Sequence, residues 1–191
     1  MTTPTIGELH TAVVGNQQNI ADLTKKINHN IEYAAFRGVD YGNNGEGNLL
    51  IVGQGENGEL RKTITMKATG SKIRLTASIC YSSNDSVYSP RFRFARNGAV
   101  ISDALGNSNG NRVQCTFATH YPNASRGMGV ANMTYIYDPG TYTLTDNFEF
   151  SVVVSIYGNK EWYINRTSYD SADNDSVARA ISTFQVEEIF Q

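Results

Sequence analysis

The sequence is poor in the residues that mark several protein classes. Of its 191 residues, 18% are charged, four are proline, three are histidine, two are cysteine and one is tryptophan. The low charge, which nets −2, excludes a highly charged disordered chain and a basic protein that binds nucleic acid. No apolar run approaches the roughly 20 residues that cross a bilayer. We therefore expect a globular chain that neither binds nucleic acid nor inserts into membranes.

The N-terminus and the two cysteines bear on the compartment in which the protein is made. The first eight residues lack the basic and apolar regions of a secretory signal, so we expect synthesis in a host cytoplasm. Cys80 and Cys115 each lie among alternating apolar residues. This setting predicts two buried free thiols, and a disulfide between them is the alternative.

The N-terminal region repeats apolar residues at steps of three and four from Ile6 to Ala34. Such a narrow heptad stripe predicts a coiled-coil helix over residues 10–36. The predicted interface residues are Leu9, Val13, Asn16, Ile20, Leu23, Ile27 and Asn30. Because a buried amide is costly unless it meets identical amides across a symmetry axis, the two asparagines resemble the layers of trimeric autotransporter stalks and imply a parallel trimer. The alternative is an amphipathic helix that packs on its own domain.

Glycines and a change of period follow the predicted helix. Seven glycines between Arg37 and Gly58 predict that the helix ends near Phe36 and that residues 37–62 form a neck. Beyond the neck apolar residues alternate, and Asn97-Gly98 between two such runs predicts a hairpin. The predicted strands are Lys72–Tyr81, Arg91–Arg96, Ala99–Ser102, Asn111–Thr119, Ala131–Tyr137, Phe148–Tyr157, Trp162–Asn165 and Ala180–Ile189. Short strands separated by turns predict an antiparallel sandwich over residues 63–191.

Five landmarks of this β-rich part occur in the order expected for a family of phage proteins. They are Ser71–Leu75, Phe94–Ala99, Asp138–Tyr142, Asn165–Thr167 and Ser182–Ile189. Through them the region from about Ile64 to Ile189 resembles the carboxy-terminal domains of tail-fibre and related virion proteins of bacteriophages, particularly cyanophages. The resemblance implies a trimeric jelly-roll knob similar to C1q and tumour-necrosis-factor heads. The expected fold class is mainly β: an antiparallel jelly-roll sandwich head preceded by an N-terminal α-helical coiled-coil stalk.

Candidate catalytic and metal-binding residues are few. His10 and His29 fall on the outward side of the predicted helix, and His120 is expected in a loop. A cluster of Asp170, Asp173 and Asp175 is explained by a solvated loop, because the glycine and the distal glutamate of a calcium loop are missing. We expect no enzymatic activity, no cofactor and no metal. A polysaccharide-degrading enzyme is the distant alternative, and no paired-carboxylate site is identified for it.

Aromatic residues near the ends of predicted strands are the one signal of binding. The candidate receptor contacts are Tyr88, Tyr121, Trp162, Tyr163 and Tyr169. Tyrosine and tryptophan at such places stack on sugar rings or anchor a protein surface. The alternative is that these residues belong to the core or to the trimer interface.

The resemblance implies a structural virion protein, a homotrimeric phage tail fibre whose head attaches to the host surface. Residues 1–9, with Pro4 and Ile6, are expected to dock onto baseplate, tail or capsid proteins, because they precede a helix weakened by Gly7 and Gly15. The expected partner of the head is a glycan or a protein of the host. The alternative is a capsid-attached head fibre or a decoration protein, such as a cement protein or knob.

Overall fold

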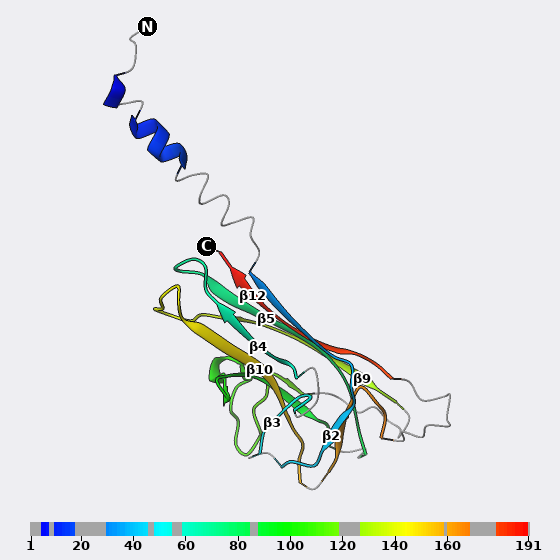
Figure 1. Cartoon of the computed structure of the whole chain (residues 1–191). Helices are drawn as coiled ribbons and strands as arrows, with labels where there is room; N and C mark the ends of the chain where they lie inside the picture. Colours follow the sequence, from blue (N-terminus) through cyan, green and yellow to red (C-terminus); the bar gives the residue numbers. More distant parts are fainter. Residues whose placement is uncertain are drawn as a thin grey trace.

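The computed structural model describes residues 5–7, 10–17, 30–45, 48–54, 59–84, 88–118, 127–158, 160–168 and 179–190. They contain helical residues at 6–7 and 10–17 and twelve strands in two antiparallel sheets (Figure 1). The first sheet contains β1 (Ile31–Phe36), β2 (Asp40–Gly42), β5 (Lys72–Ser83), β9 (Gly129–Tyr137), β11 (Trp162–Ile164) and β12 (Ser182–Ile189). The second contains β3 (Leu50–Ile51), β4 (Arg61–Thr65), β6 (Arg91–Arg96), β7 (Ala99–Val100), β8 (Phe117–Ala118) and β10 (Asn147–Ser155). A short 3-10 helix, η1 (Ser102–Ala104), follows β7.

Short strands lie end to end, so each sheet is narrower than its strand count suggests. In the first sheet β12 and β11 pair with successive parts of one edge of β5, and β9 pairs with the other edge. β1 and β2 lie outside β12 and β11. In the second sheet β4 and β3 line one edge of β10, β6 lines the other, and β7 and β8 lie outside β6. The predicted mainly β, antiparallel sandwich is confirmed.

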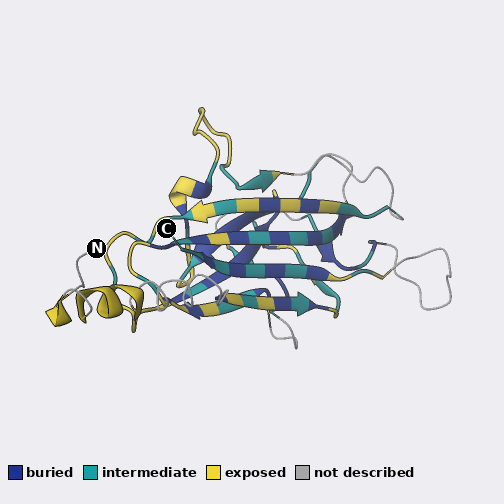
Figure 2. Ribbon diagram, turned by 90° about the horizontal axis from the view of Figure 1, so that it is seen from above, coloured by how far each residue is buried: buried dark blue, intermediate teal, exposed yellow. Residues whose placement is uncertain are grey.

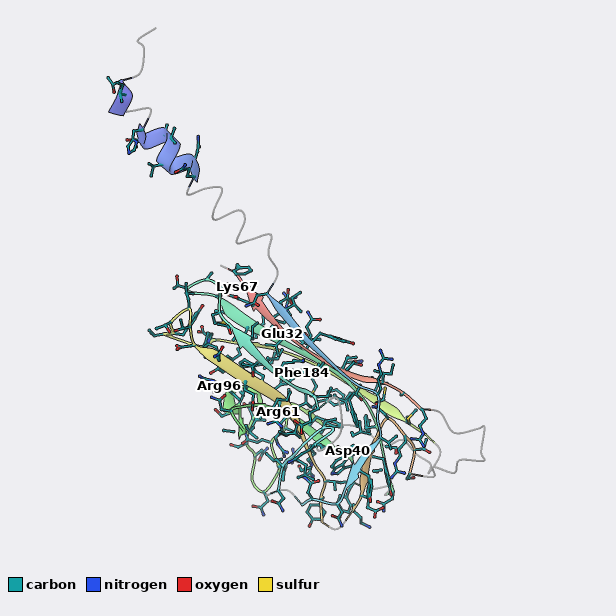
Figure 3. The ribbon with its side chains drawn as sticks, in the orientation of Figure 1. Glu32, Asp40, Arg61, Lys67, Arg96 and Phe184 are labelled. Carbon is teal, nitrogen blue, oxygen red and sulfur yellow. The ribbon has the colours of Figure 1, made fainter. Side chains whose placement is uncertain are left out.

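The core between the sheets follows the predicted alternation. The inward residues of β5 are Ile73, Leu75, Ala77, Ile79 and Tyr81, and all are buried. Strand β12 alternates between buried and half-buried residues, and Figure 2 shows such alternating bands along the strands. Phe184 of β12 stacks on Phe94 of the second sheet with ring centroids 6.0 Å apart, in the middle of the sandwich (Figure 3). Burial of such rings is the main stabilising term.

Local turn chemistry predicted one hairpin correctly. Strands β6 and β7 pair across Asn97 and Gly98, whose φ angles of 48° and 78° are those that an Asn-Gly turn favours. The strand predicted over Asn111–Thr119 is shorter, because only β8 pairs with β6. The carbonyl oxygens of Gln114 and Cys115 instead accept hydrogen bonds from the buried Arg93 side chain and from the Gly106 N–H.

The predicted end of the helix near Phe36 is wrong. Residues 31–36 form β1, which pairs with β12, and Ala34, expected on the helical stripe, points into the sandwich core. Asn30, expected at a trimer axis, is 7% exposed and donates through Nδ2 to the Thr65 carbonyl oxygen and to Glu188. Ala34 and Phe36 fit a strand whose alternate side chains point into the core, and Ala34 also fits the heptad repeat. The apolar stripe alone therefore does not distinguish a helix from a strand at this position.

The predicted neck over residues 37–62 is also wrong, because this segment belongs to the sandwich. It contributes β2, β3 and the start of β4, and Val52 and Leu60 are fully buried. Its glycines allow close packing: a Cβ at Gly38 or Gly53 would lie 2.9 or 3.0 Å from the Phe36 ring. The sandwich therefore begins at Asn30 instead of residue 63.

Candidate functional site

Loops and strand ends opposite the start of β1 form what we call the distal end. It consists of β2, β11, the end of β5, and residues 43–45, 84, 88, 156–158 and 160–161. Figure 1 shows β2 at this end and the start of β1 at the other. The labelled Asp40 and Lys67 mark the same two ends in Figure 3. The helical residues 10–17 extend beyond the end at which β1 begins (Figure 1). The distal end is thus the part of the sandwich farthest from the N-terminal helix.

A stacked aromatic cluster lies on the outer face of the first sheet at the distal end. Tyr41 and Tyr163 are cross-strand partners whose ring centroids lie 6.4 Å apart, with an interplanar angle of 22°. The Arg166 guanidinium lies over both rings, with Cζ 5.1 Å from the Tyr41 centroid and 4.7 Å from the Tyr163 centroid. Tyr163 is 8% exposed, whereas Tyr41 is 65% exposed. The cluster therefore holds an exposed tyrosine ring on a packed support.

A carboxylate beside this cluster is fixed by hydrogen bonds. The backbone N–H of Glu161 donates to Asn84 Oδ1 (2.9 Å), and Asn84 Nδ2 donates to Glu161 Oε2 (2.9 Å). The Tyr163 hydroxyl donates to the same carboxylate. Burial and this hydrogen bond raise the pKa of Tyr163 to about 12, so the hydroxyl stays protonated and remains a donor. A small cleft of about 90 Å³ is lined by Tyr41, Gly42, Asn43 and Glu161.

The prediction of Trp162 as a receptor contact is wrong. Trp162 is fully buried, and its Nε1–H donates to Asn44 Oδ1. Asn44 Nδ2 in turn donates to the Val154 carbonyl oxygen (2.8 Å). Gly42 covers the indole so closely that a Cβ at this position would lie 2.6 Å from Trp162 Cζ2. Trp162 supports the distal end from inside the core.

Two of the other predicted receptor residues can be placed. Tyr163 lies in the aromatic cluster, where Tyr41 and Arg166 cover it. Tyr88 is half-buried at the distal end and stacks on Tyr157, with centroids 4.6 Å apart. Tyr157 is 50% exposed. Tyr121 and Tyr169 lie outside the described residues.

The sequence analysis missed Tyr41, Asn43 and Glu161. Tyr41 and Asn43 lie in the glycine-rich segment that was interpreted as a neck, so they were not considered as parts of a strand end. Glu161 precedes Trp162 in a predicted turn, and charged turn residues carry no signal on their own. Two pairs of neighbours in the sequence could have indicated the cluster: Tyr41 beside Gly42, and Tyr163 beside Trp162. A glycine within a strand marks a place where another group packs closely.

The predicted trimer-interface and docking residues are only partly described. Val13 is 54% exposed and Ile6 is 87% exposed, and Asn16 is also exposed. Leu9, Ile20, Leu23, Ile27 and Pro4 lie outside the described residues. Every described residue from Thr5 to Gln17 is exposed, so in these residues the helix does not pack on its own sandwich. Asn30 does not join them, because it is buried at the base of β1.

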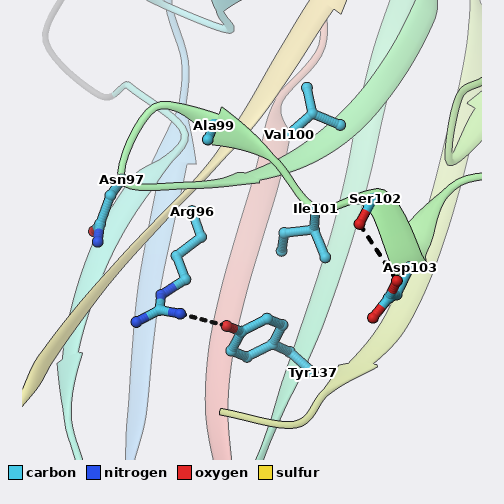
Figure 4. Close-up of a pocket in the computed structure, with 8 residues that line it drawn as sticks. All are labelled: Arg96, Asn97, Ala99, Val100, Ile101, Ser102, Asp103 and Tyr137. Carbon is cyan, nitrogen blue, oxygen red and sulfur yellow. Dashed lines mark hydrogen bonds between the residues drawn. The ribbon is translucent and has the colours of Figure 1, made fainter. Parts of the chain in front are cut away.

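A second candidate site is an open pocket of about 510 Å³ beside the β6–β7 hairpin (Figure 4). It is lined by Arg96, Asn97, Ala99, Val100, Ile101, Ser102, Asp103 and Tyr137. Arg96 Nη1 donates to the Tyr137 hydroxyl (2.6 Å), and its guanidinium lies 4.7 Å from the centroid of the Phe148 ring. Asp103 accepts from the Ser102 hydroxyl (3.3 Å). The pocket thus offers one anchored cation and one carboxylate to a small polar group.

Three further observations concern metals, thiols and membranes. Among the residues that the structure describes, no three His, Cys, Asp or Glu side chains lie close enough to hold a metal ion, and His120, Asp170, Asp173 and Asp175 lie outside them. Cys80 and Cys115 are free thiols, as predicted, but are half-buried instead of buried, and burial raises the pKa of each. The described residues include no helix that is long and apolar enough to span a membrane.

Comparison with known proteins adds no family. No protein-family model and no curated protein sequence matches this chain.

Proposed function

We propose that this protein is a homotrimeric structural protein of a phage particle, a tail fibre without enzymatic activity whose distal end contacts the host surface. The observation that carries the proposal is the uncovered apolar residues of the N-terminal helix. Ile6 and Val13 lie on the predicted seam and are 87% and 54% exposed in the single chain. An apolar helix face that its own domain leaves in water favours association with identical helices.

Exposed apolar residues on the outer face of the first sheet also favour association of identical chains. Ile31 and Tyr33 of β1 and Val130 and Ile136 of β9 are exposed on it, at 42% to 55%. Most other outward residues of this sheet are uncharged, and the Arg74–Glu187 ion pair (3.2 Å) offsets two of the charges that are present. Because β1 follows the helix in the chain, an axis through three helices passes near this sheet. Cyclic trimers bury apolar patches such as this one of β1 and β9 around their axis, and β2 contributes no residue to it.

The path of the chain supports a jelly-roll head. In chain order, β1 lies in the first sheet, β4 in the second, β5 in the first, β6 and β7 in the second, β9 in the first, β10 in the second and β12 in the first. Repeated crossing between two antiparallel sheets in this order is the connectivity of a jelly roll. It agrees with the resemblance of residues 64–189 to virion knobs.

The arrangement suits attachment to a host. An N-terminal segment docked on the particle leaves the distal end of each sandwich pointing outward. Three identical weak sites on one support then raise the avidity by roughly 100-fold or more without any new contact. A fibre of this kind is assembled in the host cytoplasm and functions on the virion.

The trimer is tested by a pair of substitutions at neighbouring valines. Val13→Asp places a charge on the predicted seam, whereas Val14→Asp places it one position away, at nearly the same exposure in the single chain (54% and 50%). We expect Val13→Asp to weaken association by at least about 100-fold, because an unpaired charge is costly at a dry axis. Val14→Asp should leave it nearly unchanged.

Sedimentation equilibrium at micromolar concentration measures the outcome. The unmodified protein should show three times the chain mass of 21.0 kDa. Val13→Asp should move the mass toward that of one chain. A monomeric unmodified protein, or equal effects of both substitutions, contradicts the trimer.

The place on the particle needs its own measurement. Cryo-electron microscopy of particles that carry a labelled copy of this protein should show density projecting from the tail, with the label on the distal end pointing outward. Density on the shell would support the capsid fibre or decoration protein instead. Particles without the label at either place would contradict a virion role.

A further inference from the structure

We infer that the distal end binds a neutral hexose unit of a host-surface glycan, with the sugar ring on Tyr41 and its hydroxyls on Glu161 and Asn43. This inference rests on the proposed attachment function and names the chemistry of its ligand. The residues that carry it are the aromatic cluster, the fixed carboxylate and the cleft between them.

The first observation is an exposed ring that is already immobilised. Tyr41 is 65% exposed although its ring contacts Tyr163 and the Arg166 guanidinium. The aliphatic C–H face of a pyranose packs on such a ring and removes apolar surface of both partners from water. Because neighbours already hold the ring, binding loses little side-chain entropy.

The second observation is a carboxylate with spare acceptor capacity next to this ring. Glu161 Oε2 accepts from Asn84 and from Tyr163, and within the described residues Oε1 accepts from no side chain or backbone N–H. A carboxylate accepts about four hydrogen bonds, so roughly two positions remain. Two adjacent hydroxyls of one sugar match them. Asn43, which lines the same cleft, can add an amide donor and an acceptor.

The shape of the site limits how the sugar lies. The cleft of about 90 Å³ is too small to enclose a pyranose ring. Only the hydroxyl-bearing edge of the ring therefore enters it, while the ring itself lies on Tyr41. A surface site that covers one side of a single sugar binds weakly, and the three copies of a trimer then supply the avidity.

The charges of the site select a neutral sugar. Of the four residues that line the cleft, Glu161 is the charged one, whereas the Arg166 guanidinium lies over the Tyr41 and Tyr163 rings and does not line the cleft. The carboxylate of a uronic acid would meet Glu161 and be repelled. Hydroxyl groups of a neutral hexose donate to it instead.

Saturation-transfer difference NMR on the full chain tests the inference. The probes are the methyl pyranosides of glucose, mannose and galactose, with glucuronic acid as the acidic comparison. We expect transfer to at least one neutral pyranoside and at least about tenfold weaker binding of glucuronic acid. Tyr41→Ala should weaken the neutral sugar by at least about tenfold, and Glu161→Gln should weaken it severalfold.

Tyr157→Ala is the matched control. Tyr157 is also an exposed tyrosine (50%) whose ring stacks on a neighbour, Tyr88, but it does not line the cleft. This variant should bind the sugar normally. Circular dichroism checks that each variant is folded, and Glu161→Gln keeps the inference testable if Tyr41→Ala does not fold.

Four results would overturn the inference: no transfer to any neutral pyranoside, equal binding of glucuronic acid, equal losses in Tyr41→Ala and Tyr157→Ala, or a change of oligomeric mass in Tyr41→Ala. The last would place Tyr41 between copies of the chain. The two proposals fail separately. A trimeric virion protein that binds no sugar contradicts only the sugar site, and a monomer that binds sugar through Tyr41 contradicts only the fibre.

Discussion

Replacing Asn165 with alanine should lower the free energy of unfolding by about 3 to 6 kcal/mol and the melting temperature by roughly 15 °C. Asn165 is fully buried between the end of β11 and the start of β12. Its Nδ2 donates to the carbonyl oxygens of Phe36 (2.8 Å) and Gly38 (2.9 Å). Its Oδ1 accepts from the Ser182 hydroxyl (2.7 Å). Alanine leaves the buried Phe36 and Ser182 groups and the half-buried Gly38 carbonyl oxygen without these bonds, which costs more than the bonds themselves contribute.

The backbone groups of Asn165 cannot replace the hydrogen bonds of its side chain, because they are already engaged. Its N–H donates to the Cys80 carbonyl oxygen (2.9 Å) and its carbonyl oxygen accepts from the Ala180 N–H (3.2 Å). The chain therefore leaves the edge of β5 at Asn165, bonds to Asn165 again at Ala180, and pairs with β5 from Thr183 onward. The Asn165 side chain connects this point to the start of β12 through Ser182. It also connects it to the segment between β1 and β2 through the carbonyl oxygens of Phe36 and Gly38.

Asn97→Ala is the control for backbone conformation. Asn165 and Asn97 are the two described residues other than glycine with positive φ, at 59° and 48°, but Asn97 is exposed in the β6–β7 turn. Alanine at Asn97 should cost only about 1 kcal/mol, the cost of the left-handed conformation. Urea unfolding followed by circular dichroism measures both variants. Equal losses would show that the buried hydrogen bonds at Asn165 contribute nothing beyond this strain.

The parts of the fold that the sequence predicted are those that local chemistry determines. The period of two in β5 and the Asn-Gly turn after β6 each act within a few residues, and both were predicted correctly. The boundary at Asn30 was predicted wrongly, because it depends on Glu188 and Thr65, which are distant in the chain. A heptad stripe does not contain that information.

The distal end shows the same limit for a site. Aromatic residues near strand ends were the correct kind of signal, and Tyr163 is part of the cluster. Whether such a ring faces water depends on its partner across the sheet. Trp162 and Tyr163 are adjacent, yet one points into the core beneath Gly42 and the other stacks under Tyr41. A shift of one residue in register reverses which of the two is accessible.

The start of the sandwich at Asn30 is held by a buried carboxylate. Glu188, near the end of β12, is 2% exposed. It accepts from the backbone N–H groups of Lys67 (2.9 Å) and Ala68 (2.9 Å) and from Asn30 Nδ2 (2.8 Å). Its own N–H donates to the Asn30 carbonyl oxygen (2.9 Å). These bonds fix Asn30, the residue at which the chain enters β1.

Glu188→Ala should therefore lower the free energy of unfolding by about 3 to 5 kcal/mol, because three donors lose a buried charged acceptor. Glu188→Gln should also be destabilised, since its amide NH₂ would face N–H donors. Glu187→Ala is the adjacent control: Glu187 pairs with Arg74 on the outer face of the sheet, and its loss should cost at most about 1 kcal/mol. Hydrogen exchange should show the Lys67 and Ala68 amides exchanging faster in Glu188→Ala alone. If these amides keep their protection, Glu188 does not fix the start of the sandwich, and other contacts hold Asn30 in place.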